Sequence, residues 1–472
     1  MHKRIRLIIR NLEDLYNSET IKKMAEKHLF TKRKGKISAE DFLNLCTFKG
    51  EDLCSVPLTR LAARLEANDQ ILISPQGLNK KFNKEAVNFM KSILTEMLKC
   101  QNGILRNNES LLKMKFNRIT IVDSTGFKLN DKLKNTFKGA GVASAMKIQL
   151  QYDLITGAFI LCEIKEGANS DASYIGELQK NMQKGDLCLK DLGYYKIEDL
   201  KFINDQEAFY VSKVKINTNL YRGNNITEYG PKGEPKIRKR YSYLNIQELA
   251  EPLDEGETFE LDDIYIGNTP KNRTKTRLIL TKLTTDCKRK KEIHTKNAKD
   301  RGSIKGDARN IWWLDYNCYI TNVPKETLSK EKVHEIYTLR WGVELMFKIW
   351  KSLFKIHVVK KINLDRIHCF IYGRLIMLLL TSSIVFTARD ILYSEKNKEI
   401  SEIVSFGIVL ENFDYLEKNI FNSGIKLYQI IRRMVNSIDR LGKKSRKKGK
   451  NTPRLIFKGI KIQEGDLVKL AS

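Results

Sequence analysis

The stretch RITIVD (118–123) marks the point at which the pattern of this sequence changes from helices to strands. Residues 1–100 before it have the spacing of amphipathic helices and carry many basic side chains. The stretch itself is short and apolar, which favours a buried strand. It ends in Asp123, where a loop containing glycine, VDSTGF (122–127), is expected to begin. The sequence therefore predicts a chain that starts helical and continues as an α/β sheet.

A hairpin, a helix and a further strand follow in the sequence and complete the predicted sheet. MKIQLQYDLITGAFILCEIKEG (146–167) alternates on both sides of a Thr-Gly turn and predicts a β-hairpin. A helix is expected at about 173–182, and then a fourth strand in GDLCLKDLGYY (185–195) that ends in Asp191. Three strands, a helix and another strand are the opening of a ribonuclease-H-like α/β sheet. Asp123 and Asp191 would then lie at carboxyl ends of strands, where open α/β sheets place their ligands.

Residues 207–322 predict an all-β domain inserted into this core. They contain alternating, β-rich pieces separated by Gly, Pro, Asn and charged residues, and no amphipathic helix is expected among them. The fold class is therefore α/β, with a ribonuclease-H-like core in two parts, 101–206 and 323–395. A helical N-terminal region (1–100) and a basic helical C-terminal region (396–472) flank it.

The segment EIYTLRWGVELMFKIWKSLF (335–354) predicts a helix with two different faces. At about 100° per residue, one face carries a tyrosine, four cations and a single carboxylate: Tyr337, Arg340, Glu344, Lys348, Lys351 and Lys355. The opposite face is apolar and is expected to lie on the core: Leu339, Val343, Met346, Trp350 and Leu353. The polar face is either a solvated ladder of ion pairs, each worth about 0.2–0.5 kcal/mol, or a functional surface.

The composition points to an anionic partner. The 472 residues carry 85 Lys and Arg against 56 Asp and Glu, a formal net charge of +29. Cations on a protein gain affinity for nucleic acid by releasing counterions from its phosphates, so nucleic acid is the expected partner. The best apolar run, LIMLLLTSSIVF (375–386), has 12 residues. A transmembrane helix needs about 20, so a buried helix is expected there and no membrane association.

The N-terminus and the cysteines both indicate an intracellular protein. MHKRIRLIIRNLEDLY (1–16) becomes charged before any sustained apolar stretch forms, so no secretion signal is expected. The eight cysteines are scattered and include no CxxC pair. This spacing favours reduced thiols over disulfides or a zinc site.

Two basic regions outside the core are candidates for DNA contact. VPLTRLAARLEANDQILISPQGLNKKFN (56–83) predicts two short helices, with Ser74 as N-cap and Pro75 as first residue of the second. This pair is either a helix-turn-helix, which would offer a DNA groove four polar side chains, or simple helix packing: Gln76, Asn79, Lys80 and Lys81. Further on, residues 432–461 contain twelve Lys or Arg and one acidic residue. That run is either a solvated tail or a phosphate-binding arm.

Two aspartates at strand ends and a glutamate on a cationic helix face are the groups that a two-metal phosphoryl-transfer site requires. Hard cations such as Mg²⁺ prefer carboxylate oxygens. Two such ions, about 3.5–4 Å apart, stabilise the attacking and leaving oxygens of an in-line displacement. Asp123, Asp191 and Glu344 would together serve both ions. Each aspartate alone also has a simpler interpretation, because Asp is a common turn-former after a strand.

The residues around Asp123, Asp191 and Glu344 resemble the motifs of a known family. The spacing Tyr337-x2-Arg340-x3-Glu344-x6-Lys351 matches the YREK signature of the bacterial DDE transposases of the insertion sequence 4 family, in its insertion sequence 231-like branch. VDSTGF and KDLGYY are similar to the first and second aspartate blocks of that family, in the right order and with a long β insertion before the glutamate. The resemblance extends over residues 118–385.

The resemblance implies a role for each matching residue. Asp123, Asp191 and Glu344 would be catalytic and would ligate two Mg²⁺ ions, with Mn²⁺ able to substitute. Four side chains of the signature helix would contact DNA: Tyr337, Arg340, Lys348 and Lys351. In the family a flipped base stacks on a tryptophan of the β insertion. Trp312 and Trp313 are the candidates here, or else buried core residues.

The function implied is cut-and-paste transposition of an insertion sequence. The steps would be metal-dependent hydrolysis at the element ends, a hairpin intermediate, and strand transfer into target DNA. The partners would be double-stranded DNA, namely terminal inverted repeats and a target, with a homodimer holding both ends in a synaptic complex. The protein would lie in the bacterial cytoplasm, associated with the nucleoid. The alternatives are a catalytically inactive DNA-binding relative and a ribonuclease-H-like nuclease.

Overall fold

A computed structural model of the chain divides it into two units. The first unit comprises Met1–Leu112, Ser124–Asn169 and Gly342–Lys450, and the second comprises Lys113–Asp123, Ser170–Trp341 and Asn451–Ser472. The structure describes residues 2–31, 35–50, 53–106, 116–215, 218–224, 229, 231, 240–267, 269, 272–300, 314–360, 363–420, 424–444 and 456, without the side chains of 290 and 294–300.

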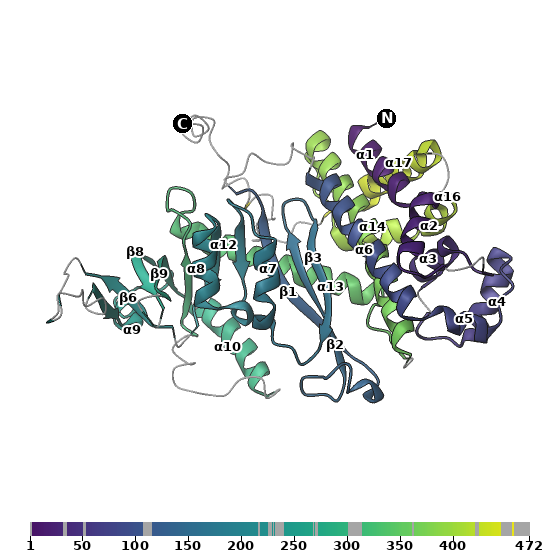
Figure 1. The fold of residues 1–472 in the computed structure, drawn as a ribbon. Coiled ribbons are helices and arrows are strands. Elements are labelled where there is room, and N and C mark those ends of the chain that lie inside the picture. Colours follow the sequence, from purple (N-terminus) through teal and green to yellow (C-terminus); the bar gives the residue numbers. More distant parts are fainter. Residues whose placement is uncertain are drawn as a thin grey trace. The chain divides into compact units, whose positions relative to one another are not determined.

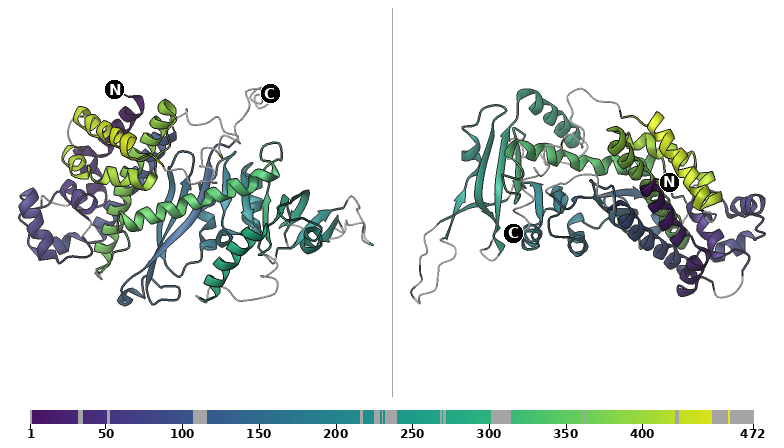
Figure 2. Two further views of the ribbon diagram at one scale, coloured as in Figure 1. Left: turned by 180° about the vertical axis from the view of Figure 1, so that it is seen from behind. Right: turned by 90° about the horizontal axis from the view of Figure 1, so that it is seen from above.

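The first unit is built mainly from helices (Figure 1). Its N-terminal helices are α1 (Lys3–Leu15), α2 (Ser18–Lys27), α3 (Ala39–Thr47), α4 (Leu58–Asp69), α5 (Pro75–Lys81) and α6 (Lys84–Arg106). Its later helices are α13 (Gly342–Ser352), α14 (Leu364–Lys396), α15 (Glu402–Leu410), α16 (Phe413–Asn419) and α17 (Gly424–Leu441). Helices α1 and α17 pack against each other, so segments from opposite ends of the sequence lie side by side (Figure 2).

Helix α14 is the core of the first unit. It is long and apolar enough to cross a membrane, with a mean hydropathy of 1.9, but 94% of that apolar window is buried inside the protein. Helices α3, α6 and α15 pack around it. Every residue of the apolar run 375–386 is buried. The prediction of a buried helix at this run is therefore confirmed.

The helix pair predicted at residues 56–83 is present as α4 and α5. The Ser74 side chain accepts a hydrogen bond from the backbone N–H of Gly77, and Pro75 is the first helical residue. Lys81 is partly buried, and its ammonium lies 5.3 Å from the centroid of the Phe30 ring. The other three side chains expected at a DNA groove are exposed: Gln76, Asn79 and Lys80.

The strands lie in a ten-stranded sheet with the order β3-β2-β1-β4-β5-β10-β9-β8-β6-β7. Their bounds are β1 (Ile119–Lys128), β2 (Ala145–Asp153), β3 (Phe159–Glu166), β4 (Leu187–Lys190), β5 (Phe209–Lys213), β6 (Leu220–Gly223), β7 (Tyr241–Leu244), β8 (Thr258–Ile266), β9 (Thr274–Lys282) and β10 (Tyr316–Thr321). Strand β1 passes from the second unit into the first between Asp123 and Ser124. The predicted hairpin at 146–167 is the antiparallel pair β2 and β3, in the first unit.

In the second unit the sheet changes character along its width. Strands β1, β4 and β5 run parallel, whereas β10, β9, β8, β6 and β7 pair antiparallel. Among the described residues of this unit, the helices are α7 (Ile175–Lys180), α8 (Ile197–Asp205), α9 (Ile246–Ala250), α10 (Thr285–Asp300) and α12 (Lys330–Thr338). Short 3₁₀ turns accompany them, namely η4 (Asp171–Tyr174), η5 (Leu192–Tyr194) and η8 (Leu339–Trp341).

Segment 207–322 is not all β, which corrects the expectation. It contains the short helix α9 and the 16-residue helix α10. The sequence of α10, TDCKRKKEIHTKNAKD, is rich in Lys, which favours helix, but it has no apolar stripe to reveal an amphipathic helix. The strands of this segment also lie in the same sheet as β1 and β4.

Asp123 is not at the end of its strand, which corrects a second expectation. Strand β1 continues through Asp123 to Lys128. The alternation of buried Thr125 and Phe127 with exposed Gly126 and Lys128 is the strand signal. Gly126 suggested a loop because glycine is common in turns, yet here it lies within a paired strand.

The signature segment is not one helix. Helix α12 ends at Thr338, the 3₁₀ turn η8 follows, and α13 begins at Gly342. Glycine has a low helix propensity, and a Cβ atom at Gly342 would lie 3.0 Å from Leu154 Cδ2. Helix α13 ends at Ser352, so Lys355 lies beyond the helix, with φ of 50°. The apolar face is confirmed within α13, where Val343, Met346 and Trp350 are buried.

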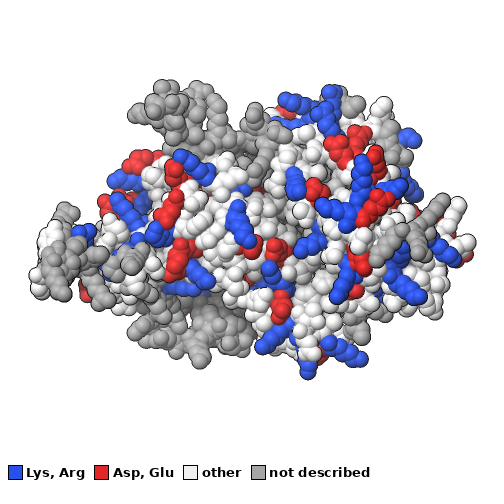
Figure 3. Space-filling view, viewed as in Figure 1, with Lys and Arg blue, Asp and Glu red and all other residues white. Residues whose placement is uncertain are grey.

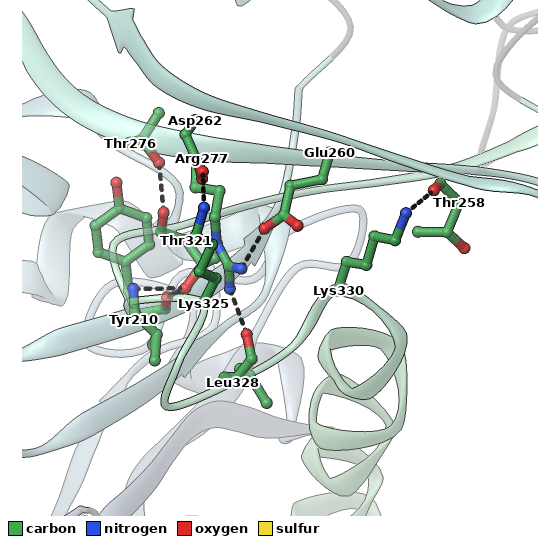
Figure 4. A network of polar contacts seen from close by, with 11 residues as sticks. Tyr210, Thr258, Glu260, Asp262, Thr276, Arg277, Thr321, Lys325, Leu328 and Lys330 are labelled. Carbon is green, nitrogen blue, oxygen red and sulfur yellow. Dashed lines mark hydrogen bonds and ion pairs between the residues drawn. The ribbon is translucent and has the colours of Figure 1, made fainter.

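A polar network fixes the start of α12 to the antiparallel strands (Figure 4). Buried Arg277 of β9 pairs with Glu260 of β8 and donates from Nη2 to the Leu328 carbonyl at 2.7 Å. Lys330, the first residue of α12, donates to the Thr258 carbonyl at 2.9 Å. Since these bonds join α12 to strands of the same unit, they hold the helix that carries Tyr337 in place.

The charges do not gather into one patch on the face drawn in Figure 3. Lys and Arg side chains are scattered there among Asp and Glu. The basic run at 432–461 falls mostly outside the described residues, apart from α17 and residues 442–444 and 456. The interpretations of that run as a tail or as a phosphate-binding arm both stay predictions.

Candidate active site

Asp123 and Asp191 come together in the second unit because neighbouring parallel strands carry them. Strands β1 and β4 pair with Ile121 opposite Leu189. Asp123 and Asp191 each lie two residues further along and therefore at the same level of the sheet. The Asp191 carboxylate also caps η5 by accepting a hydrogen bond from the Gly193 N–H at 3.4 Å. The exposed fractions of the two side chains are 23% for Asp123 and 40% for Asp191, so water and ions can reach both.

Arg340 joins the two aspartates. Its Nη1 lies 3.5 Å from Asp123 Oδ2, and its Nε lies 3.7 Å from Asp191 Oδ1. Only 12% of the arginine side chain is exposed, so the charges meet in a partly desolvated place. The two carboxylates are therefore close enough to share one cation, and in this structure the cation is a guanidinium.

Lys213 is a site residue that the sequence analysis missed. Strands β4 and β5 are parallel with Lys190 opposite Ser212, so Lys213 lies at the level of Asp191. Three successive parallel strands thus carry Asp123, Asp191 and Lys213 in one row. Burial lowers the pKa of Lys213, with Arg340 adding to the effect and Asp191 opposing it. The signal for this residue was a lysine at the carboxyl end of the strand that follows the Asp191 strand.

Tyr337 is a buried residue and does not lie on an open polar face. Its ring packs at 5.1 Å from that of Tyr319, and the Lys213 ammonium lies 5.6 Å from the Tyr337 ring centroid. Burial raises the pKa of the Tyr337 phenol, and the charge of Asp191 adds to that rise. The hydroxyl therefore stays neutral near the aspartates.

The neighbouring side of β4 is held by a separate buried ion pair. Lys190, directly before Asp191, pairs with Asp199 of α8, and both side chains are almost fully buried. Successive residues of a strand point to opposite faces, so this pair lies on the face away from Asp191. Gln179 also donates to Asp199 at 2.9 Å. The strand end that carries Asp191 is thus anchored from behind.

The remaining signature residues lie in the first unit, on α13. Glu344 is in the first turn and is partly buried, Lys348 is exposed, and Lys351 is in the last turn. Lys351 Nζ donates to the Gly126 carbonyl of β1 at 3.2 Å. Val343, Met346 and Trp350 bury the opposite side of the helix. This anchors α13 so that its polar residues keep fixed positions within the first unit.

The aspartate pair has the right chemistry for a hard divalent cation. Carboxylate oxygens are the ligands that Mg²⁺ and Mn²⁺ prefer, and Asp123 and Asp191 already converge on one positive group. Within the described part of the chain, no three acidic, histidine or cysteine side chains are assembled as a metal site. Two of the three predicted carboxylates are therefore brought together within one unit. Trp312 and Trp313 lie outside the described residues.

Comparison with known proteins identifies the family of this chain. Residues 114–380 match the Transposase DDE domain, and this range contains Asp123, Asp191 and the YREK segment. The chain belongs to the DDE transposases. It is also 40% identical over 474 residues to the transposase for insertion sequence element IS1151 of Clostridium perfringens, covering 100% of both chains. The predicted resemblance to bacterial insertion-sequence transposases is confirmed.

Further transposases match along nearly the whole chain. The transposase for insertion sequence element IS231F of Bacillus thuringiensis subsp. israelensis is 34% identical over 452 residues, which is 94% of this chain and 93% of the relative. The IS231E transposase of B. thuringiensis subsp. finitimus is 32% identical over 474 residues. A solved piggyBac transposase synaptic complex with hairpin DNA aligns over 97% of this chain and 88% of that chain, with 11% identity and a TM-score of 0.41.

Proposed function

We propose that this transposase excises and inserts its own insertion sequence by metal-dependent phosphoryl transfer at Asp123, Asp191 and Glu344. The observation that carries the proposal is the pair of aspartates on adjacent parallel strands, joined by Arg340 of the signature segment. Four residues after Arg340 the same segment supplies Glu344. The core around them would be the ribonuclease-H-like part of the chain, with 207–322 as its insertion.

The three carboxylates would hold divalent ions, which we expect to be Mg²⁺ with Mn²⁺ as a substitute. When bound, the ions would activate water and stabilise the attacking and leaving oxygens. Asp123 and Asp191 would each give up contact with Arg340 to take on this role. Glu344 would complete the ligand set from the first turn of α13. Hydrolysis would break the P–O3′ bond at each element end and leave a 3′ hydroxyl and a 5′ phosphate.

The cations of the site would bind the scissile strand. Once the aspartates are engaged elsewhere, Arg340 would be able to donate to a DNA phosphate through its planar guanidinium. Lys348 and Lys351 would contact phosphates further along. Tyr337 would add a neutral ring at the base of this surface. Each such contact releases counterions, so binding would weaken as salt rises.

The later steps follow from the family. The freed 3′ hydroxyl would attack the opposite strand to form a hairpin on the element DNA, and after opening it would join to target DNA. A tryptophan at 312 or 313 would stack the base that flips during hairpin formation. Two terminal inverted repeats have to be held together, so we expect a homodimer in a synaptic complex. The protein would work in the bacterial cytoplasm, on the nucleoid.

Binding of the repeats would also involve regions outside the core. The exposed side chains of α5 would face a DNA groove, with 1–100 serving as a DNA-binding domain. The basic region 396–472 would contact DNA backbone or the second protomer. Residues 101–206 and 323–395 would form the two parts of the catalytic domain.

The test is cleavage of duplex oligonucleotides that carry the inverted repeats bracketing the gene. Wild-type protein should nick or cut them with Mg²⁺ or Mn²⁺ and should be inert in EDTA or Ca²⁺. Glu344→Gln, Asp123→Asn and Asp191→Asn should lose cleavage by orders of magnitude while still shifting the DNA in a gel. Glu335→Gln is the matched control, because it removes a carboxylate from α12 that pairs with Lys332 outside the site.

Two other outcomes would favour the alternative functions. Wild-type protein that binds the repeats with no cleavage under any metal condition would be a catalytically inactive relative. Cleavage of RNA–DNA hybrids in preference to the repeats would indicate a ribonuclease-H-like nuclease. Cleavage that persists in EDTA would contradict the metal-dependent mechanism itself.

A further inference from the structure

Tyrosines line one face at the far end of the second unit's sheet, where β6 and β8 are labelled in Figure 1. The register places Tyr243 of β7 opposite Tyr221 of β6, Tyr221 opposite Tyr265 of β8, and Tyr265 opposite Lys275 of β9. Directly opposite residues share a face of the sheet. Tyr241, two residues before Tyr243, belongs to the same face. We call these four tyrosines, with Arg273, the tyrosine face.

The other face of the same strands is the packed core. Leu220, Ile264 and Ile266 are buried there among the residues that surround α8 and α9. The tyrosine face is different, since Tyr243 is 63% exposed and the other three rings are partly exposed. The tyrosines are therefore not needed to fill the hydrophobic core.

The covering of this side of the sheet stops before it reaches the tyrosines. Further along β9, Arg277 lies on the same side as Lys275 and is buried beneath the segment that leads into α12 (Figure 4). Two residues before it, Lys275 is exposed. Among the described residues, α12 and its preceding loop thus cover one end of this side and leave the tyrosine end open.

An arginine is held between two of the rings. The Arg273 guanidinium carbon lies 4.0 Å from the ring centroid of Tyr221 and 4.1 Å from that of Tyr241. The rings also contact one another edge to face, with centroids 5.0 Å apart for Tyr241 and Tyr265. Gly223 makes room for this arrangement, because a Cβ atom there would lie 3.1 Å from Tyr265 Cε2. The cluster is preorganised, and its side chains have little freedom to lose on binding.

Arg273 keeps its positive charge within the cluster. Its Nε and Nη1 atoms are buried from solvent and have no hydrogen-bond partner among the described residues. Cation–π stacking holds its plane but uses none of its N–H groups. The two acidic residues closest in sequence, Asp262 and Asp263, pair with Lys325 and Lys275.

The tyrosine face itself carries two cations, Arg273 and the exposed Lys275, which lies opposite Tyr265. Arg222 in β6 and Arg240 directly before β7 are also exposed, but each directly neighbours a tyrosine along its strand and therefore points to the other face of the hairpin. In the sequence, Arg240 ends the basic stretch PKIRKR (235–240). A partner that offers flat apolar faces together with negative charge would therefore complement the rings and the arginines.

We propose that the tyrosine face binds unpaired nucleotides of single-stranded DNA. Bases stack on exposed Tyr243 beside the neighbouring rings, and the phosphates are attracted by the positive charges of Arg273 and Lys275, with Arg222 and Arg240 adding attraction from the other face of the hairpin. Unpaired DNA is the fitting occupant because bases within a duplex do not expose their flat faces. The inference rests on the proposed function only in taking DNA as the substrate, since strand cleavage and excision leave unpaired segments near the element ends.

The test measures binding of a fluorescein-labelled oligothymidylate of 15 nucleotides to the full chain. Tyr243→Ser should raise the dissociation constant about tenfold, because loss of one stacking ring is a large part of such binding. Tyr243→Phe, which keeps the ring, should bind like wild type. Arg273→Gln should weaken binding and reduce its dependence on salt. Tyr415→Ser is the matched control, because Tyr415 is 56% exposed and lies near Arg433 but outside this face.

Several results would overturn the proposal. One is equal binding by wild type and Tyr243→Ser, and another is an equal loss in Tyr415→Ser. The same Tyr243 dependence with a blunt duplex of matched length would indicate a phosphate site without base stacking. A change in sedimentation coefficient of the free protein on Tyr243→Ser would assign the face to contact between copies of the chain.

The proposal and the proposed function fail separately. Asp123→Asn should lose cleavage of the repeats and keep tyrosine-dependent binding of the oligothymidylate. If the wild type cuts the repeats but Tyr243→Ser binds the oligothymidylate as tightly as the wild type does, only the proposal for the tyrosine face is refuted. If Tyr243-dependent binding is present without any cleavage, only the enzymatic proposal is refuted.

Discussion

The guanidinium of Arg340 lies 3.5 Å from the carboxylate of Asp123 and supplies a positive charge to it, as a bound metal ion would. The same arginine reaches Asp191 at 3.7 Å. An arginine that neutralises two carboxylates also competes with any cation that needs them. Arg340 would therefore have two states, one on the aspartates and one on DNA phosphate, and metal binding would favour the second.

Arg340→Gln should bind Mn²⁺ more tightly than wild type in the absence of DNA. A partly exposed ion pair is worth about 1 kcal/mol, which corresponds to about fivefold in the dissociation constant. Binding of repeat DNA by the same variant should weaken, because glutamine cannot supply the positive charge that binds a phosphate. Titration calorimetry with Mn²⁺ gives the first quantity and gel shift the second. Lys201→Gln on α8 controls for net charge, since Lys201 pairs with Asp205 away from the site. Unchanged or weaker Mn²⁺ binding would contradict the competition.

Lys213→Met should separate stability from function. Burial lowers the pKa of Lys213, so its charge is held at a cost in folding free energy. Methionine keeps an unbranched apolar stem, and the melting temperature should stay equal or rise. Cleavage of repeat DNA should fall at least about tenfold if the cation beside Asp191 helps to hold a phosphate, a loss of about 1.4 kcal/mol. Lys213→Arg should recover part of the rate. A fully active Lys213→Met protein would remove Lys213 from the site.

Lys291 should make the stability depend on pH above neutrality. Burial, helped by the charge of Lys213, lowers the pKa of Lys291 from 10.5 to about 8, with Asp315 and Cys318 opposing the shift. Between those two values the unfolded chain holds a proton that the folded chain has lost. Stability from this group should therefore rise as the pH goes from about 8 to 10.5 and should be lowest below about 8.

Lys291→Met should remove that dependence. The variant should be more stable than wild type at pH 7, by about 1–3 kcal/mol, and the two proteins should approach each other by pH 10.5. Urea denaturation at five pH values measures the difference. Lys288→Met is the control on the same helix, because Lys288 is paired with Asp315 and half exposed. A constant difference between Lys291→Met and wild type across the range would contradict the assignment.

The basic C-terminal run should contribute salt-dependent DNA affinity. Deleting residues 441–472 should weaken binding to repeat DNA and flatten the plot of log K against log salt, by about 0.9 for each duplex phosphate that the run neutralises. Fluorescence anisotropy at four salt concentrations gives the slope. An unchanged slope would leave the run as a solvated tail or a contact between protomers, which sedimentation would distinguish.

The sequence was informative wherever a local pattern has one structural solution. Alternation with a Thr-Gly turn predicted the hairpin β2–β3, and Ser74-Pro75 predicted the start of α5. The apolar run 375–386 predicted a buried helix, since no other place suits so many apolar side chains. The predictions from the sequence were wrong where local signals conflict or are missing. Gly126 suggested a loop although it lies within β1, and α10 was missed because a helix without an apolar stripe has no periodic signal.

For the candidate site, too, the sequence identified residues but not their surroundings. The residue types and spacings of the YREK segment and of the two aspartate blocks are properties of the sequence, and they were sufficient to select Asp123, Asp191 and Glu344. Tyr337 was placed correctly on its segment but not in its surroundings. The helix turns at η8, and the Tyr337 ring is buried against Tyr319 of β10.

The sequence by itself determined which residue types are candidates for the chemistry and whether strands or helices carry them, because strand and helix periodicities are set by the few residues around each position. Only the tertiary structure decided which of them meet. The row of Asp123, Asp191 and Lys213 depends on the register of β1, β4 and β5, and the tyrosine face depends on the register of four strands between residues 220 and 282. Between strands that are distant in sequence, register is fixed by backbone hydrogen bonds and by the side chains packed around them, and the pattern within one strand does not identify its partner.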